Sequence, residues 1–417
     1  MKKSTIFIVA LLLLFTYANA QTVKVLFDAT KAETAGNADW VIDSDLFNLG
    51  FGTGPAVVGG GNESNPQRTP TPSQSNITAA TAETYWTGGL SNWGIDCVKK
   101  GYTVETLPYN GSITYGNSSN VQDLSNYNIF IVCEPNIVFT AAEKTAIVNF
   151  VKNGGSLFMV SDHTVSDRNN DGWDSPAIWN DLMTNNSVQS NPFGISFDLA
   201  NVSPNSSNIA NNANDSLLHG PMGNVTSVMW SNGTTMTLNT TANPTVKAAV
   251  YTTGVSNTGT TGVLVAYARY GFGKVVAIGD SSPCDDGTGD TNDVLYNGYT
   301  LDAGGNHQRL LMNATIWLAT TQTATAVVPV NNLFTYFNIT PIPFNNQFTI
   351  NYSLKNTAAL QFTLSSLNGC VLYNWNKGIV TAGEHNENFS INTLAKGVYV
   401  LTIQCGKNSF SKEVIVN

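Results

Sequence analysis

The first part of the chain contains three short apolar runs, and a segment with the periodicity of an amphipathic helix lies between the second and the third. Residues 23–30, 126–135 and 156–162 are each rich in apolar and β-branched side chains, which is typical of a strand buried on both faces. Before the third run, Thr140 and Glu143 have the spacing of a capping box, and the helical period after them ends at a glycine pair. Strand, helix and strand with short connections predict a parallel sheet covered by helices.

The pattern changes in the middle of the chain and then returns. Residues 184–260 are rich in Asn, Thr and Ser and contain only short alternating runs, which predicts an inserted irregular or antiparallel section. Residues 273–282 again have the pattern of a buried strand, here ending in a polar turn. Asn306 can cap a final helix whose apolar positions share one face. We therefore predict one α/β domain over residues 21–319.

The C-terminal residues follow a different period. Residues 320–332 have the composition of a linker. Residues 333–417 alternate apolar and polar positions in short segments, with turns at Asn-Gly and Lys-Gly. This pattern predicts a small β-sandwich after the α/β domain.

Residues 1–20 have the pattern of a secretory signal peptide. Lys2 and Lys3 precede an apolar run, and residues 18–20 (Ala-Asn-Ala) provide a small-residue cleavage site. We expect no integral membrane segment after signal cleavage, because no later apolar run is long enough. The formal net charge of −9 argues against a general nucleic-acid binder, which would present a basic face. It does not exclude a nuclease that acts through bound metal ions.

The five cysteines are an odd number, so at least one is unpaired or pairs elsewhere. An exported chain can form disulfides. Cys370 and Cys405 both lie in the C-terminal region and are the expected pair. The sequence favours no pairing among Cys97, Cys133 and Cys284.

Four C-terminal segments resemble a known sorting domain. They are ITPIPFNNQFTINYSL (339–354), LSSLNGCVLY (364–373), LAKGVYVLTI (394–403) and the final KEVIVN. Together they resemble the sorting domain of the type IX secretion system of Bacteroidetes, whose usual Pro-Asn-Pro is here Pro-Ile-Pro at 341–343. The resemblance implies contact with the type IX secretion machinery, export across the outer membrane, and a secreted or cell-surface protein.

Three further segments resemble a second family. FVKNGGSLFMVSD, GKVVAIGDSS and GNHQRLLMNATIWLA are similar to segments of the class I glutamine-amidotransferase-like, flavodoxin-like fold. The resemblance implies a flavodoxin-like parallel sheet over the core of residues 23–319. True amidotransferases place a cysteine nucleophile on the turn after the fourth strand. Here residues 160–163 read Val-Ser-Asp-His, so glutaminase chemistry is not expected.

Ionisable residues gather after the predicted strands, at the edge where open parallel sheets bind ligands. Asp28, Asp162, His163 and Asp280 follow strands, and His307 opens the last helix. Carboxylates that share an edge repel one another unless some are protonated or a cation neutralises them. Asp162, His163 and Asp280 are therefore our first candidates for ligands of a divalent metal of unknown identity, or for acid–base groups. Asp28 follows as a ligand and His307 as a catalytic group; turn capping without function is the alternative.

Ser161 offers a rival mechanism. It stands close to the nucleophile position of the resembled fold, with His163 and Asp162 as its neighbours and His307 or His219 as a possible base in place of His163. Neighbours in sequence rarely form a working Ser-His-Asp triad, and the chain has no G-x-S-x-G elbow. The metal-assisted reading is therefore preferred.

The segment 167–174 matches half of a calcium loop. Asp167, Asn169 and Asp171 occupy loop positions 1, 3 and 5, and Gly172 occupies position 6. The bidentate Glu of position 12 is missing, although Asp174 could partly compensate. A calcium-stabilised loop and a metal-free polar turn both remain open.

These features predict a secreted, metal-assisted hydrolase that acts on an extracellular polymer. A polysaccharide is favoured, because exposed Trp rings stack on sugars and five Trp residues fall in or near the predicted loops: Trp40, Trp86, Trp93, Trp173 and Trp179. A phosphoesterase or nuclease acting at the same edge is one alternative. A non-catalytic, calcium-stabilised binding or adhesion protein is the other.

Overall fold

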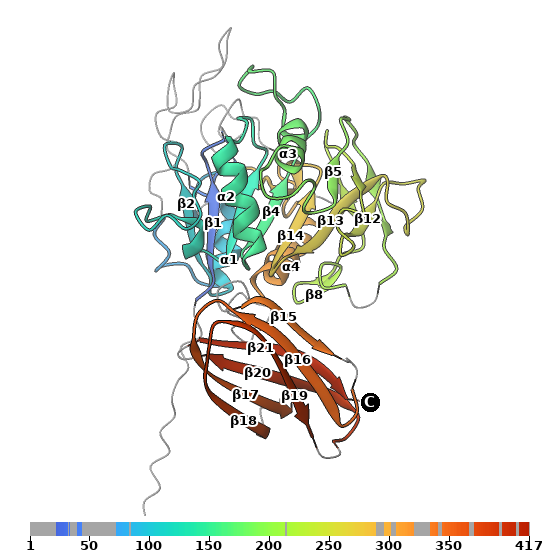
Figure 1. Ribbon diagram of the computed structural model, residues 1–417. Coiled ribbons are helices and arrows are strands. Elements are labelled where there is room, and N and C mark those ends of the chain that lie inside the picture. Colours follow the sequence, from blue (N-terminus) through green and yellow to red (C-terminus); the bar gives the residue numbers. More distant parts are fainter. Residues whose placement is uncertain are drawn as a thin grey trace, which may run out of the picture. The chain divides into compact units, whose positions relative to one another are not determined.

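The computed structural model describes residues 22–31, 33, 40–43, 72–82, 85–212, 215–288, 296–301, 306–320, 334–340, 344–366, 371–391, 394–405 and 408–416. The predicted signal peptide and nearly all of the predicted linker lie outside these residues. The chain divides into two compact units between Thr320 and Thr321, called here the N-terminal unit and the C-terminal unit (Figure 1).

Five parallel strands form one half of the N-terminal sheet. They are β1 (Lys24–Asp28), β2 (Thr103–Leu107), β3 (Ile129–Cys133), β4 (Ser156–Val160) and β14 (Gly273–Ile278). Their order across the sheet is β2-β1-β3-β4-β14, and each neighbouring pair is parallel. Every residue of β3, β4 and β14 is buried, as expected for continuous apolar strands that are covered on both faces.

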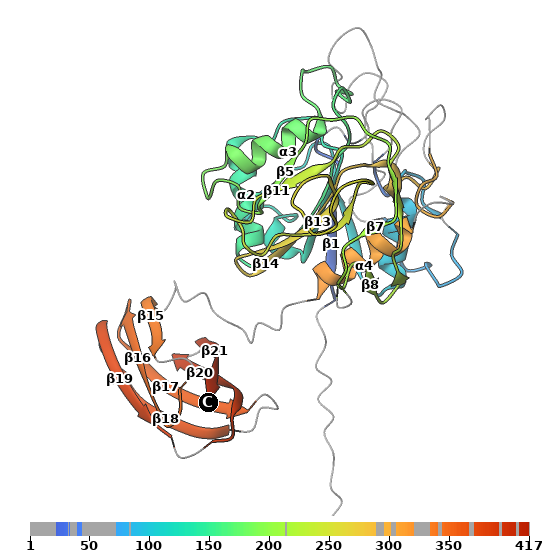
Figure 2. The ribbon, with the colours of Figure 1, turned by 90° about the vertical axis from the view of Figure 1, so that its right-hand side faces the viewer.

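Helices cover the two faces of this half-sheet (Figure 2). They are α1 (Ser91–Lys99), α2 (Ala141–Lys152), α3 (Ser175–Thr184) and α4 (His307–Ala319), with the short 3-10 helices η2 (Leu124–Asn126) and η3 (Ser282–Cys284). Side chains of α1 and α4 share one hydrophobic core, and side chains of α2 and α3 share a second core on the opposite face. The expected capping box is present, because Thr140 and Glu143 each accept a backbone N–H of the other.

The segment between α3 and β14 adds antiparallel structure to the same sheet. Its strands are β5 (Ile195–Phe197), β6 (Asn205–Ser206), β7 (Asn208–Ile209), β8 (His219–Gly220), β9 (Gly223–Asn224), β10 (Val228–Met229), β11 (Met236–Leu238), β12 (Lys247–Tyr251) and β13 (Val263–Tyr270). β13 pairs antiparallel with β14, and β11, β5, β12 and β7 continue the sheet beyond it. The N-terminal unit therefore contains a mixed parallel and antiparallel sheet.

The C-terminal unit consists of two antiparallel sheets around one core. One sheet contains β15 (Phe334–Thr340), β16 (Gln347–Leu354) and β19 (Gly383–Ser390). The other contains β17 (Ala358–Ser366), β18 (Val371–Val380), β20 (Gly397–Cys405) and β21 (Asn408–Val416). Along β16 every second residue is buried, so the alternation in the sequence places one face in the core.

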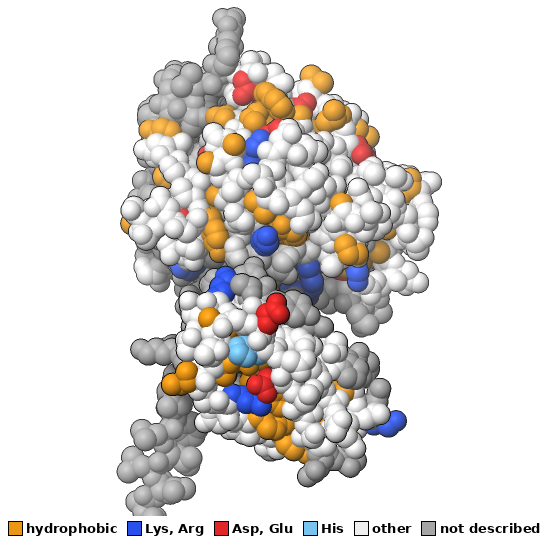
Figure 3. Space-filling model, viewed as in Figure 1, with side chains coloured by type: hydrophobic (Ala, Val, Ile, Leu, Met, Phe, Trp, Pro, Cys, Tyr) orange, Lys and Arg blue, Asp and Glu red, His pale blue; other side chains and the backbone are white. Residues whose placement is uncertain are grey.

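The surface reflects the low content of charged residues, which make up 11% of the chain. Figure 3 shows that Asp, Glu, Lys and Arg side chains are sparse on the face of the N-terminal unit that it displays. Several of the acidic side chains are instead buried in the interior of this unit.

Candidate active site

The parallel strands bring three acidic side chains to one edge of the sheet. Cys133 pairs with Val160 and Val160 pairs with Ile278, so β3, β4 and β14 end at the same level. Glu134, Asp162 and Asp280 follow these ends within one or two residues. All three are almost completely buried, with exposed fractions of 0%, 2% and 0%. Charges buried this deeply are costly unless they are paired, hydrogen-bonded or neutralised by a proton.

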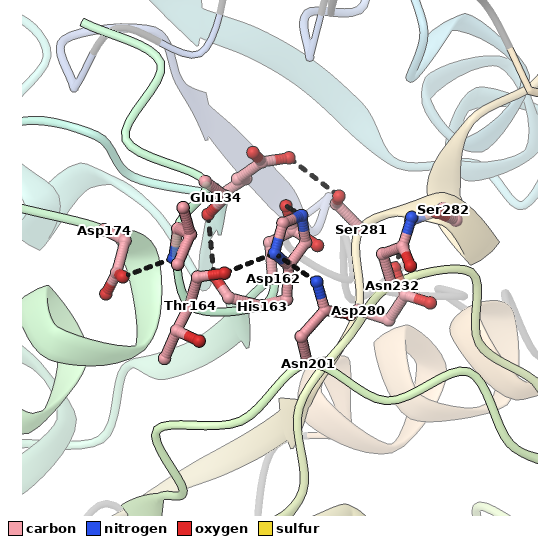
Figure 4. A network of polar contacts seen from close by, with 12 residues as sticks. Glu134, Asp162, His163, Thr164, Asp174, Asn201, Asn232, Asp280, Ser281 and Ser282 are labelled. Atoms are coloured by element: carbon pink, nitrogen blue, oxygen red, sulfur yellow. Dashed lines mark hydrogen bonds and ion pairs between the residues drawn. The ribbon is translucent and has the colours of Figure 1, made fainter. Parts of the chain in front are cut away.

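Both carboxyl oxygens of Glu134 accept hydrogen bonds, and Figure 4 shows the one from Ser281. The Ser281 hydroxyl donates to Glu134 Oε2 at 2.7 Å, and Arg168 Nε donates to Glu134 Oε1 at 2.8 Å. Arg168 also reaches Asp162, with 3.4 Å between Nη2 and Oδ2. Glu134 has a φ of 46°, in the left-handed region that is uncommon for a residue other than glycine. The backbone of Glu134, directly after the end of β3, therefore has an unfavourable conformation, as is frequent at functional sites.

The surroundings of Asp162 favour its protonated form. Burial raises its pKa well above the usual range, and the charges of Glu134 and Asp280 raise it further. Arg168 opposes this shift, and a hydrogen bond to the Glu134 carboxyl favours the protonated form. His163 lies beside it, with 3.6 Å between Nε2 and Asp162 Oδ2. These influences favour the neutral carboxylic acid form of Asp162, which is the form that can donate a proton.

Asp280 has a different set of partners. Its Oδ1 accepts the backbone N–H of Ser282 at 2.9 Å, and its Oδ2 accepts that of Ser231. Burial raises the pKa of Asp280 to about 7, although these backbone hydrogen bonds oppose the shift. The close approach of the Ser231 segment requires glycine, because a Cβ on Gly279 would lie 2.0 Å from the Thr234 carbonyl oxygen. Asp280 titrates near neutral pH and changes the charge around Asp162.

A cavity of about 350 Å³ opens at this edge. Asp162, His163, Arg168 and Ser281 line it, together with Trp40, Ser231, Asn232, Ser282, Asp285 and Tyr296. Glu134 lies behind Ser281 and is fully buried. A molecule in the cavity would therefore meet the Ser281 hydroxyl and the Asp162 carboxylic acid, with the Glu134 carboxylate supporting both.

Asp28 lies at the same edge but forms a separate acid pair. Its Oδ1 accepts the Thr30 hydroxyl at 2.9 Å, while the Lys31 backbone N–H donates to Glu33 Oε2 at 2.8 Å. The other oxygens, Asp28 Oδ2 and Glu33 Oε1, find no conventional donor. Burial raises the pKa of both residues, that of Glu33 the more strongly, and a side-chain hydrogen bond joins them. We infer that Asp28 and Glu33 share a proton.

Two other predicted catalytic residues do not line the cavity. His307 is buried, with Nδ1 bonded to the Gly298 carbonyl at 2.8 Å and Nε2 accepting the Met229 N–H at 3.0 Å. Both ring nitrogens therefore serve loop structure. Ser161 is also fully buried, and its hydroxyl donates to the Asp162 carbonyl at 3.3 Å rather than facing a base.

Carboxylate side chains of the segment 167–174 accept hydrogen bonds from backbone N–H groups of the same segment. Asp167 accepts the N–H groups of Asp171 and Gly172 at 3.1 and 2.7 Å, and Asp171 accepts that of Trp173 at 2.9 Å. Asn169 donates its side-chain amide to Asp171 at 3.0 Å. Asp174 is the N-cap of α3 and also accepts the Val165 N–H. Calcium binding by this segment stays a prediction.

The predicted metal ligands do not form a recognisable metal cluster. Within the described residues, no three His, Cys, Asp or Glu side chains are arranged to hold a metal ion. Arg168 provides part of the positive charge that the sequence led us to expect from a cation. The metal at Asp28, Asp162, His163 and Asp280 stays a prediction.

The expected ring of exposed Trp side chains is wrong in four of five cases. Trp40, Trp86, Trp93 and Trp179 have exposed fractions of 6%, 3%, 0% and 0%, because they pack into the two hydrophobic cores. Trp173 alone is exposed, at 39%. The Trp argument for a sugar substrate therefore fails.

Sequence reasoning did not single out Glu134, Arg168 or Ser281. Glu134 and Ser281 carry a sequence signal, because each follows a predicted buried strand. Arg168 carries no such signal, since it comes from the polar loop after Asp162 and is positioned only when that loop folds back.

The comparisons with known proteins identify the C-terminal region. The family described as "Secretion system C-terminal sorting domain" matches residues 338–417. No curated protein is significantly similar to the chain. Within the described residues, no helix is long and apolar enough to cross a membrane.

Solved structures give only distant likenesses. The mmIFT52 N-terminal domain is 16% identical over 59% of this chain and 97% of its own, with a TM-score of 0.39. A cytoplasmic protein from Salmonella typhimurium, STM3548, is 11% identical over 56% of this chain and 87% of its own, with a TM-score of 0.35. At these scores neither likeness bears on function. Residues 338–417 are thus a type IX secretion sorting domain, and the chain is exported across the outer membrane to the cell surface or the medium.

Proposed function

We propose that this protein is an exported hydrolase that cleaves an ester or amide bond in an extracellular polymer. The observation that carries the proposal is the Ser281 hydroxyl, which lines a cavity and donates to the buried Glu134 carboxylate at 2.7 Å. A carboxylate in this position can accept the hydroxyl proton as Oγ attacks a carbonyl carbon. Ser281 replaces Ser161 as the candidate nucleophile.

Asp162 supplies the second half of the chemistry. It lines the same cavity, and its raised pKa favours the protonated form that a proton donor requires. We propose that Asp162 donates this proton to the leaving group when the tetrahedral intermediate collapses. Water then attacks the acyl-enzyme, and the ionised Asp162 accepts the water proton. Glu134 returns its proton to Ser281 Oγ as the acyl–oxygen bond breaks, so both carboxyl groups regain their starting forms. Arg168 holds Glu134 in position and limits the negative charge around it.

The proposed mechanism uses no metal step. The sequence favoured a metal-assisted reaction, and that reading remains testable with a chelator. If activity survives chelation, the carboxyl mechanism is supported. If chelation removes activity and zinc, manganese or magnesium restores it, the metal reading is supported instead.

An acylated polysaccharide is the first substrate to test. Export brings the protein to extracellular polymers, and ester groups on polysaccharides offer the carbonyl carbon that a serine nucleophile requires. A panel of small aryl esters and acetylated polysaccharides provides the assay. Absence of turnover on ester and amide panels, together with calcium binding, would favour the binding or adhesion alternative.

Substitution of the nucleophile gives the decisive comparison. We expect Ser281→Ala to lower kcat/KM by at least about 1,000-fold, because it removes the attacking oxygen. Ser175→Ala is the matched control, since the Ser175 hydroxyl is buried without a hydrogen-bond partner in the described structure. Comparable activity of Ser281→Ala and the wild-type protein would exclude this mechanism. A covalent serine-directed inhibitor should label Ser281 in the wild-type protein.

We also propose that the N-terminal unit belongs to the amidotransferase-like, flavodoxin-like class. The order β2-β1-β3-β4-β14 with five parallel strands supports this assignment, because it is the order of flavodoxin-like sheets. The turn after β4 carries Ser161 and no thiol, so glutaminase activity is not part of the proposal.

A further inference from the structure

Two cysteines lie on one face of the sheet at the edge that carries the cavity. Cys133 is the last residue of β3, and Cys284 is the last residue of η3, the turn that follows β14. Cys133, Val160 and Ile278 form one row across β3, β4 and β14. All three side chains and that of Cys284 belong to the same hydrophobic core. The turn after β14 therefore brings Cys284 into the hydrophobic core that contains Cys133.

The two thiols are neighbours in this core. Both are free thiols in the structure, with exposed fractions of 1% for Cys133 and 0% for Cys284, and their side chains interact. Burial raises the pKa of Cys133 well above its usual value, and the Cys284 thiol adds to the shift. Cys97 lies in the same core, and among the described cysteines its thiol is free.

We propose that Cys133 and Cys284 are joined by a disulfide bond in the exported protein. The chain passes into an oxidising compartment, where disulfides form and persist. Two S–H bonds break and one S–S bond forms; two protons and two electrons pass to a dithiol–disulfide exchange protein, whose own disulfide becomes a dithiol. Since both thiols are buried in the folded unit, this exchange takes place before the core closes.

The bond would connect the two halves of the candidate site. Cys133 precedes Glu134, and Cys284 lies three residues after Ser281. A covalent link between them restrains the turn that carries Ser281 relative to the strand that carries Glu134. The proposal does not depend on the proposed hydrolase activity, because it is tested by chemical analysis alone.

Peptide mapping of the exported full-length protein tests the bond directly. The protein is unfolded and alkylated without reductant, then digested and analysed by mass spectrometry. We expect a cross-linked peptide pair containing Cys133 and Cys284, which separates after reduction, and an alkylated Cys97 as the internal control. Recovery of Cys133 and Cys284 as separate alkylated peptides without reduction would overturn the proposal.

Single substitutions provide a second test. In Cys133→Ala, Cys284 should become alkylatable without reductant, and the converse should hold for Cys284→Ala. Reductant should lower the melting temperature of the wild-type protein and of Cys97→Ala by the same amount, and leave that of the Cys133→Ala/Cys284→Ala double variant unchanged. An equal response to reductant in all three proteins would contradict the assignment.

Discussion

The two units of the chain differ in the burial of their acidic side chains. In the N-terminal unit, Glu134, Asp162 and Asp280 are buried at one edge of the sheet, and Asp28 and Glu33 form a second buried acid pair. In the C-terminal unit, every described buried side chain is apolar or aromatic. Two antiparallel sheets with alternating positions are enough to build the second unit, and its described Glu, Lys and His side chains are all at least partly exposed.

The difference supports our proposal that the N-terminal unit carries the chemistry. Burial of a carboxyl group costs stability and shifts its pKa, so a fold that needs only a core gains nothing from such groups. Their concentration beside a cavity in the N-terminal unit is the basis of the proposed active site. No described acidic side chain of the C-terminal unit is buried, in agreement with its match to a sorting domain.

Among the changes that test this difference between the units, removal of residues 338–417 should have the largest effect. We expect complete loss of export across the outer membrane, because the sorting domain is absent. The N-terminal unit retains both of its own hydrophobic cores and should stay folded within the cell envelope. Fractionation followed by immunoblotting gives the location. Undiminished export of the truncated protein would show that another part of the chain carries the sorting signal.

Asp162→Asn should separate chemistry from stability within the N-terminal unit. Asn resembles the neutral carboxylic acid in shape and charge but cannot donate the proton, so we expect kcat to fall by about 100- to 10,000-fold. KM and the melting temperature at neutral pH should change little. Wild-type kcat in this variant would show that Asp162 is not the proton donor.

The stability of the two units should respond differently to pH. The folded pKa of Asp280 is about 7, against an ordinary value of 3.8, so the folded state keeps a proton that the unfolded chain releases. Its contribution is therefore fully present below about pH 4 and is lost as the pH rises to about 7. The loss is on the order of 4 kcal/mol at most.

Urea unfolding at several pH values checks this expectation. The N-terminal unit should lose stability between pH 4 and 7, and the slope should be smaller in Asp162→Asn, which removes a second raised pKa. The C-terminal unit should change little over the same range. If the free energy of unfolding changed equally with pH in the two units, the proposed difference in their buried acidic side chains would be contradicted.

A cap substitution should give the smallest effect. Asp174 caps α3 and also accepts the Val165 N–H at 2.9 Å. We expect Asp174→Ala to lower the free energy of unfolding by about 1 kcal/mol and to leave kcat unchanged. Thermal unfolding with and without calcium gives the measurement. Calcium stabilisation of the wild-type protein that Asp171→Ala abolishes would confirm the calcium prediction for residues 167–174.

The sequence predicts the elements of this protein better than its contacts. Continuous apolar runs identify β1, β3, β4 and β14, and the Thr140–Glu143 spacing identifies the start of α2. These signals are local, since they arise from neighbouring residues along one strand or helix turn. The edge that carries Asp162 and Asp280 follows from them, because parallel strands end together.

The partners of each side chain could not be predicted in this way. Arg168 reaches Glu134 across 34 positions of sequence, and Ser281 reaches it across 147. The burial of Trp93 likewise depends on packing between α1, the sheet and α4. Such contacts are set by how loops fold back on the sheet, and no local pattern encodes them.

Infrared spectroscopy of the wild-type protein at neutral pH tests the central claim most directly. A protonated carboxylic acid has a carbonyl stretch that is distinct from the bands of a carboxylate. We predict such a band near pH 7 in the wild-type protein, and its weakening in Asp162→Asn, because burial and neighbouring charges raise the pKa of Asp162 and favour its protonated form. An identical carboxylic-acid band in both proteins, or no such band in either, would contradict the account.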